Sequence, residues 1–179
     1  RMRPESFAQF VGQEHILGGG KLLRRLIDSD KITSLILFGP PGCGKTTLAL
    51  MISERTKSRF ERINAASNNV ADMRRIIDAA KKRQAAGTGR TILLVDEIHR
   101  FNKAQQDVLM PDVEAGNPVL IGTTTHNPFF YVNAALLSRS QVFEFRKLTD
   151  KDITDIIERT LADKDRGLGK MPIIMDDAA

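Results

Sequence analysis

A glycine-rich stretch in the first third of the chain carries residues that bind phosphate. It reads Gly39-Pro40-Pro41-Gly42-Cys43-Gly44-Lys45-Thr46, is followed by Thr47, and comes directly after the apolar run 35–38. Small residues let successive backbone N–H groups surround a phosphate chain, and the helix that follows turns its positive N-terminal end toward the same anion. In this pattern Lys45 reaches the β- and γ-phosphates and Thr46 offers its hydroxyl to Mg²⁺. The stretch therefore predicts a nucleoside triphosphate site, with ATP and Mg²⁺ as ligands.

Two acidic residues, Asp96 and Glu97, follow a second apolar run at 91–95. A continuous apolar run of this length is typical of a strand buried on both faces of a parallel sheet, and ligands bind at the carboxyl ends of such strands. We therefore expect both acids to lie beside the glycine-rich loop. Asp96 would hold Mg²⁺, and Glu97 would act as the base that polarises the water attacking the γ-phosphate.

Other nucleotide enzymes must be weighed against this interpretation. A GTPase needs an Asn-Lys-x-Asp element to read guanine, but the segment 102–105 ends in Gln105 and comes too early in the chain. A small-molecule kinase or a helicase stays open, since the segment 96–99 matches the Asp-Glu-x-His of one helicase class. In either case we expect His99 to be a structural or coupling residue.

Two further residues are candidates for contact with the γ-phosphate. Thr124 lies at the end of the strand predicted at 119–122, so its hydroxyl could sense the phosphate. Threonine is also a common residue in strands, and Thr124 could simply be one of these. Arg139 follows a short helix predicted at 133–138 and could stabilise transition-state charge as an arginine finger. The alternative for Arg139 is an ordinary surface arginine.

The order of elements specifies an α/β fold with a mostly parallel sheet. Strands are predicted near 35–38, 60–64, 91–95, 119–122 and 142–145, and helices after the loop and at 70–85, 103–114 and 133–138. At Thr149 the pattern changes to a new helix with Asp152 as capping partner. We therefore divide the chain into a nucleotide-binding core, 1–147, and the beginning of a helical region, 148–179, in which 175–179 would open a further helix.

Composition places limits on the class of protein. The net charge is +5, from 27 Lys+Arg and 22 Asp+Glu, which is compatible with a nucleic-acid partner without requiring one. The single cysteine, Cys43, excludes an internal disulfide, and the three histidines lack metal-ligand spacing. No apolar run reaches the ~20 residues of a membrane span, so we expect a cytoplasmic protein.

One face of the helix predicted at 70–85 is the most basic part of the chain. Such a run is usually a solvated surface, but it could also track DNA phosphates. The candidate DNA contacts are Arg74, Arg75, Lys81, Lys82 and Arg83, together with Arg100 and Lys103.

Taken together, these segments resemble the AAA+ ATPases of the clamp-loader clade. The segment 96–107, with Pro111 and 113–114 after it, and the segment 133–139 are similar to the family of replication-associated recombination protein A and the Werner-helicase-interacting protein. The resemblance covers nearly the whole chain. It implies a P-loop NTPase of the AAA+ type, a three-layer αβα sandwich with a five-stranded sheet, followed by a truncated helical lid.

The resemblance also implies a function. It indicates a DNA-dependent ATPase that remodels or maintains stalled or gapped replication forks, forms a homo-oligomer and hydrolyses ATP between subunits. Replication proteins are further candidate partners, and in a bacterium the protein would associate with the nucleoid. The alternatives are a nucleotide-gated DNA or replisome scaffold with incidental turnover, and a clamp-loader or branch-migration ATPase subunit. We expect the chain alone to be a fragment that binds nucleotide and turns it over poorly.

Family roles transfer to this sequence position by position. Lys45 and Thr46 match Walker A, Asp96 and Glu97 match Walker B, Thr124 matches sensor one, and Arg139 matches the finger offered to a neighbouring subunit. Asn64 matches a polar position that couples ligand state to Glu97, and Arg3, Pro4, Val11 and Gly12 match the adenine-side segment. The family's Ala-Thr-Thr-Glu-Asn-Pro is replaced here by 123–128, which allows the sensor to shift by one residue. The second sensor arginine and the oligomerisation domain fall outside the 179 residues.

Overall fold

The computed structural model describes residues 2–171 and 173, and these form two compact units. One unit is Glu14–Lys147. The other combines the residues up to Gln13 with the segment that starts at Leu148. The helix predicted to open at 175–179 lies outside the described residues.

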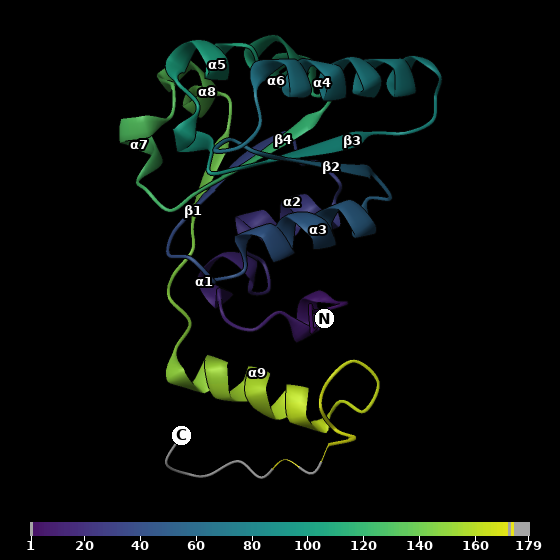
Figure 1. Cartoon of the computed structure of the whole chain (residues 1–179), viewed down its shortest axis with the longest axis vertical. Coiled ribbons are helices and arrows are strands. Elements are labelled where there is room, and N and C mark those ends of the chain that lie inside the picture. Colours follow the sequence, from purple (N-terminus) through teal and green to yellow (C-terminus); the bar gives the residue numbers. More distant parts are fainter. Residues whose placement is uncertain (1, 172, 174–179) are drawn as a thin grey trace. The chain divides into compact units, whose positions relative to one another are not determined.

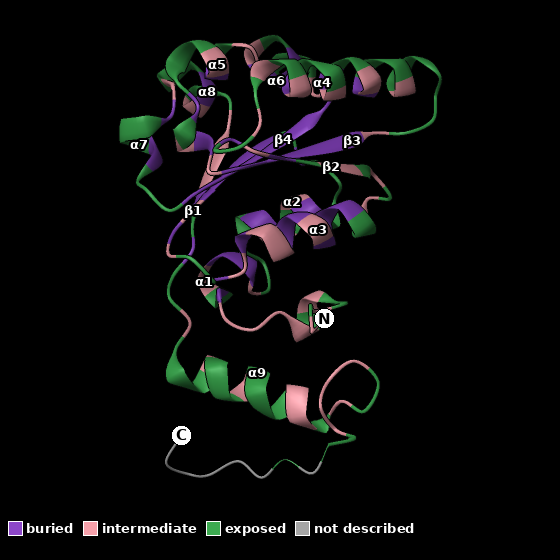
Figure 2. Ribbon diagram, viewed as in Figure 1, coloured by how far each residue is buried: buried purple, intermediate pink, exposed green. Residues whose placement is uncertain are grey.

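The larger unit is built on a sheet of five strands (Figure 1). All neighbouring strands pair in parallel, in the order β2-β3-β4-β1-β5, so the predicted parallel sheet is confirmed. Every residue of β3 and β4 is buried, as their continuous apolar sequences predict (Figure 2). The strands are β1 (Ser34–Phe38), β2 (Arg59–Asn64), β3 (Thr91–Asp96), β4 (Val119–Thr124) and β5 (Gln141–Glu144).

Helices cover both faces of this sheet and give the three-layer αβα arrangement that was predicted. Figure 1 shows α2 (Leu22–Asp28) and α3 (Lys45–Arg55) on one face, with α4, α5, α6 and α8 on the other. The other elements of the unit, α1, α7 and η2, are short and were not predicted. The elements not yet given bounds are α1 (Glu14–Leu17), α4 (Val70–Ala85), α5 (Lys103–Asp107), α6 (Met110–Ala115), α7 (Pro128–Tyr131), α8 (Ala134–Ser138) and the 3₁₀ turn η2 (Ile98–Arg100).

Local sequence explains where two of these helices begin and end. Helix α4 begins after Asn69, which forms a capping box with Asp72, and it buries Met73, Ile77 and Ala80 as its 3.6-residue period predicts. The prediction of a single helix at 103–114 is wrong, because the structure has two helices there, α5 and α6. Pro111 has no N–H to donate to the carbonyl of Asp107, the residue at which α5 ends.

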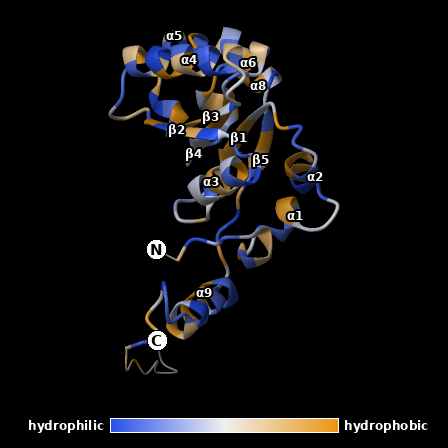
Figure 3. Cartoon of the chain, turned by 90° about the vertical axis from the view of Figure 1, so that its right-hand side faces the viewer, coloured by the Kyte–Doolittle hydropathy of each residue, from blue (hydrophilic) through white to orange (hydrophobic). Residues whose placement is uncertain are grey.

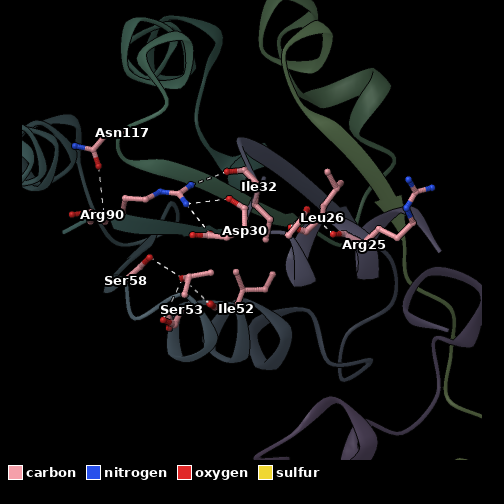
Figure 4. A network of polar contacts seen from close by, with 12 residues as sticks. Arg25, Leu26, Asp30, Ile32, Ile52, Ser53, Ser58, Arg90 and Asn117 are labelled. Carbon is pink, nitrogen blue, oxygen red and sulfur yellow. Dashed lines mark hydrogen bonds and ion pairs between the residues drawn. The ribbon is translucent and has the colours of Figure 1, made fainter. Parts of the chain in front are cut away.

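Polar side chains fasten the starts of the central strands (Figure 4). The Arg90 guanidinium donates to the Asp30 carboxylate at 2.8 Å and to the Ile32 carbonyl at 2.9 Å. The buried amide of Asn117 donates to the Ala80 carbonyl at 3.1 Å. The Arg90 bonds therefore join the start of β3 to the segment before β1, and the Asn117 bond joins the segment before β4 to α4.

The first residue of the glycine-rich loop lies against the residue that follows the last strand. The Phe145 N–H donates to the Phe38 carbonyl at 2.7 Å. Gly39 has a φ of +145°, and a Cβ at this position would lie 2.1 Å from the Phe145 carbonyl oxygen. Only glycine satisfies both conditions, so residue 39 is fixed by the fold as well as by phosphate chemistry.

The smaller unit contains the 3₁₀ turn η1 (Phe7–Gln9) and helix α9 (Asp150–Ala162). Thr149 and Asp152 form the predicted capping box. Arg159 donates to the Gln9 carbonyl at 2.6 Å, which ties the N-terminal segment to α9. Hydrophobic and hydrophilic residues alternate around α9 (Figure 3), and none of its side chains is buried. No helix in the described part of the chain is long and apolar enough to cross a membrane.

Candidate nucleotide-hydrolysis site

The glycine-rich loop turns through two glycines with left-handed backbone into helix α3. Gly42 and Gly44 have φ values of +75° and +99°, and Gly44 is the N-cap of α3. Lys45 is buried, and its amine donates to the carbonyls of Gly39 at 2.7 Å and Pro40 at 2.6 Å. The lysine charge is thus held within the loop, at the N-terminus of a helix of eleven residues.

Asp96 is a centre of polar contacts at the end of β3. Its Oδ1 accepts from the Thr46 hydroxyl at 3.3 Å and from the Thr123 hydroxyl at 2.7 Å. Its Oδ2 accepts from Arg62, at 2.7 Å from Nε and 2.6 Å from Nη2. The predicted meeting of the loop and the acidic strand end is therefore present, with β4 lying between β1 and β3.

The side-chain oxygens of Thr46 and Asp96 are suitable ligands for Mg²⁺. The ion prefers oxygen ligands and is usually held by one or two protein groups together with substrate phosphates. The Thr46 hydroxyl and the Asp96 carboxylate lie in contact and supply two such oxygens. Among the described residues there is no cluster of three or more His, Cys, Asp or Glu side chains that could hold a metal without the nucleotide.

The Arg62–Asp96 ion pair leads to a test of stability. We expect Arg62→Ala to lower the free energy of unfolding by about 1 kcal/mol, since Asp96 is buried and loses its cation, while the half-exposed guanidinium limits the effect. Arg59→Ala is the matched control. Arg59 lies on the same strand, its side chain is exposed, and its Nε lies 3.1 Å from a carboxylate oxygen of Glu61. Urea denaturation measures both, and equal losses would contradict a special role for the Asp96 pair.

Glu97 occupies a strained position next to Asp96. Its φ of +56° lies in the left-handed region, which is uncommon for a residue with a side chain. Its Oε2 lies 3.3 Å from His99 Nε2, and the Glu97 side chain is 37% exposed. The predicted base is thus at the carboxyl edge of the sheet and accessible to water.

Asn64 lies opposite Asp96 in the register of β2 and β3. Its side-chain oxygen accepts from the Ala66 N–H at 2.9 Å and so closes the turn after β2. Within residues 2–171, the side chain that contacts the Glu97 carboxylate is His99. The role of Asn64 in coupling ligand state to Glu97 stays a prediction.

The three consecutive threonines at the end of β4 and just after it have different surroundings. Thr123 contacts Asp96, whereas the wholly buried Thr124 places its hydroxyl 2.9 Å from His99 Nδ1. Thr125 follows the strand and is exposed. Thr124 therefore contacts the histidine that lies beside Glu97, and Thr125 is the exposed threonine of this group.

Arg139 is the C-cap residue of α8 and is 44% exposed. Its Nε lies 2.6 Å from a carboxylate oxygen of Glu114 on α6, and its Nη1 donates to the Ala135 carbonyl at 3.1 Å. These contacts hold the guanidinium at the surface of the core unit. Its action on a neighbouring subunit stays a prediction.

The structure sorts the candidate DNA contacts into two groups. Lys81 pairs with the buried Asp112 at 2.7 Å, and the Arg83 guanidinium donates to Thr91 at 3.2 Å, so these two side chains fasten α4 to the core. A shallow surface depression along α4 is lined by the others on that helix, Arg74, Arg75 and Lys82. Arg100 and Lys103 are exposed elsewhere on the unit.

The adenine-side candidates lie in the smaller unit. Arg3 and Pro4 precede η1, while Val11 and Gly12 precede the boundary at Gln13. Gly12 has a φ of +73°, and a Cβ there would lie 2.9 Å from Leu148, so this residue packs against the start of the α9 segment. The contact of these four residues with adenine stays a prediction.

Comparison with known proteins agrees with this site. Residues 35–148 match the family model described as the ATPase family associated with various cellular activities (AAA). The chain belongs to the AAA family. The matched segment contains the loop, Asp96, Glu97 and Arg139, and so covers the whole candidate site within the larger unit.

Individual AAA relatives are similar over nearly all of this chain. Replication-associated recombination protein A of Escherichia coli (strain K12) is 46% identical over 99% of the chain, and ATPase WRNIP1 of Dictyostelium discoideum is 45% identical over 90%. The chain spans only 39% and 18% of these two relatives. The solved structure of the RuvB Holliday junction branch migration motor of Thermotoga maritima is similar with a TM-score of 0.72 and 28% identity, over 90% of this chain and 54% of that one.

Three residues of this AAA site were not singled out from the sequence. Arg62 precedes Asn64 by two positions and so lies on the same side of β2, a signal that strand alternation provides. Thr123 lies within the threonine run but was not distinguished from Thr124. Glu114 gave no signal, because its contact with Arg139 depends on how α6 and α8 pack.

Proposed function

We propose that this chain is the ATP-hydrolysing core of a DNA-dependent ATPase that remodels or maintains stalled or gapped replication forks. The observation that supports this most directly is the meeting of Lys45, Thr46 and the Asp96-Glu97 pair at one edge of the sheet. The similarity to replication-associated recombination protein A supports the assignment to replication. In this proposal the protein is cytoplasmic and, in a bacterium, associated with the nucleoid.

Each residue of the site has a distinct role in this proposal. Backbone N–H groups of the loop, other than Pro40 and Pro41, which have none, bind the phosphates of ATP together with the Lys45 amine. Thr46 and Asp96 would hold Mg²⁺, and the ion would supply positive charge against the phosphates. Glu97 accepts a proton from the attacking water, since its carboxylate is accessible at the sheet edge.

The site is completed by a second copy of the protein in this proposal. The exposed guanidinium of Arg139 stabilises charge on the γ-phosphate held by a neighbouring subunit, so the active form is a homo-oligomer. The isolated chain then binds ATP and hydrolyses it slowly. Two alternatives have support: a branch-migration ATPase, from the likeness to RuvB, and a nucleotide-gated scaffold, in which ATP controls assembly.

DNA contact is assigned to the side chains that do not fasten α4 to the core. Arg74, Arg75 and Lys82 line one depression and would bind phosphates, with Arg100 and Lys103 as further contacts. Replacing the first three by Gln is expected to reduce the slope of log affinity against log salt by up to about 3. A matched control is the triple Gln variant at Lys21, Arg25 and Lys31, which are exposed on another part of the unit.

The decisive experiment measures ATP hydrolysis by the intact protein with forked, gapped and blunt DNA. We expect forked or gapped DNA to raise the rate more than blunt DNA, and the α4 variant to lose this stimulation while its basal rate is unchanged. The control variant should behave as wild type. An ATPase rate that is the same with and without DNA would exclude the proposal of a DNA-dependent ATPase and would favour the scaffold alternative.

A further inference from the structure

The carboxylate of Glu97 is held by a histidine two residues later in the chain. Nε2 of His99 lies 3.3 Å from Glu97 Oε2. The contact is short-range in sequence but depends on the left-handed backbone at Glu97, where the chain turns from β3 into η2. A conformation of this kind is unfavourable for a residue with a side chain, so the surrounding structure must maintain it.

The His99 ring is itself fixed on several sides. Its side chain is only 6% exposed. The ring centroid lies 4.4 Å from that of His126, at an interplanar angle of 75°, and 6.2 Å from that of Tyr131. Both neighbouring rings come from the segment after β4, so the loop and α7 together determine the plane of the imidazole.

The hydrogen bonds of His99 select one tautomer. A carboxylate can only accept, so the proton lies on Nε2, and Nδ1 then accepts from the Thr124 hydroxyl at 2.9 Å. The Thr124 oxygen in turn accepts from the His126 N–H at 3.0 Å. Burial lowers the pKa of His99, against the opposing effect of Glu97, and so keeps the ring in the neutral form that this arrangement requires.

We propose that His99 is the positioning residue for Glu97, and that Thr124 sets the orientation of His99 rather than contacting phosphate. The Nε2–H donates to Oε2, which leaves Oε1 of the same carboxylate to accept the proton of the attacking water. This inference rests on the proposed role of Glu97 as base. It extends that role by naming the chain Thr124, His99 and Glu97, which fixes the base before substrate binds.

Two substitutions at residue 99 separate the two ring nitrogens. In His99→Gln the side-chain amide can place its nitrogen near the position of Nε2, whereas in His99→Asn the shorter amide reaches only the position of Nδ1. We expect His99→Asn to lower kcat for ATP hydrolysis by roughly 10- to 100-fold with KM changed less than about 3-fold, because misplacing a catalytic group costs rate rather than binding. His99→Gln should recover most of kcat. His15→Asn, at a histidine bonded to the Glu144 carbonyl, is the control.

Nuclear magnetic resonance tests the arrangement without relying on turnover. The chain has only three histidines, so ¹⁵N-histidine labelling gives a spectrum that single replacements of His15 and His126 can assign. We expect neutral His99 in the Nε2–H form, with Nε2 shifted by Glu97→Gln and Nδ1 shifted by Thr124→Val, while His15 is unchanged in both.

The outcomes distinguish this inference from the proposed function. An Nδ1–H tautomer, or a His99 resonance unaffected by Glu97→Gln, would overturn it even if ATP is hydrolysed. Equal loss of kcat in His99→Asn and His99→Gln would also overturn it, because a merely structural histidine predicts no rescue. Correct tautomer and shifts in a protein that hydrolyses no ATP would instead support the contact and refute the proposed function.

Discussion

Glu97→Gln is expected to lower kcat for ATP hydrolysis by about 10²- to 10⁴-fold while ATP remains bound, because an amide cannot accept the proton of the attacking water. The amide keeps the size of the carboxylate and can still contact His99 Nε2 through its oxygen. Affinity for a fluorescent ATP analogue and single-turnover hydrolysis measure the two parts separately.

The control for this variant is another glutamate at a strand end. Glu144 ends β5 and is exposed, and Glu144→Gln should leave kcat within about 2-fold of wild type. If Glu97→Gln hydrolyses ATP normally, the base lies elsewhere. If it hydrolyses none yet retains the function of the intact protein at replication forks, the scaffold alternative is preferred.

The second large effect concerns the sharing of a site between subunits. Alone, Arg139→Ala should reduce the ATPase rate of the intact protein by about 10³- to 10⁵-fold, the range for loss of an arginine finger. Lys45→Ala should remove hydrolysis by weakening contact with the β- and γ-phosphates. Neither variant contains a complete site when each subunit donates Arg139 to its neighbour.

Mixing the two variants distinguishes a shared site from a self-contained one. In a random equimolar mixture of head-to-tail oligomers, about a quarter of the sites combine an intact Lys45 with an intact neighbouring Arg139. The ATPase rate should recover accordingly. Arg25→Ala, at an exposed surface arginine, is the matched control for Arg139→Ala and should be fully active by itself. Co-assembled variants that recover no activity would show that Arg139 does not act in a neighbouring site.

The central part of the site was predictable because it depends on strand ends. Lys45 and Thr46 follow one apolar strand and Asp96 follows another, and parallel strands bring such ends to the same edge of a sheet. The period of α4 and the Thr149–Asp152 cap were likewise predictable, because they depend on residues close together in sequence.

What could not be predicted depends on contacts between segments distant in sequence. The pairing of Arg62 with Asp96 requires β2 to lie beside β3 at one particular register, and that of Arg139 with Glu114 requires α6 and α8 to meet. The histidine that faces Glu97 was expected to have a structural or coupling role. Its partners, however, depend on a left-handed residue that the sequence does not reveal.

The contact between Gly39 and Phe145 has a mechanical consequence. Phe145 lies just before the boundary at Lys147, and its backbone is both hydrogen-bonded to Phe38 and packed on Gly39. A force applied to the chain where it leaves the larger unit is therefore transmitted to the first residue of the phosphate loop through two backbone contacts.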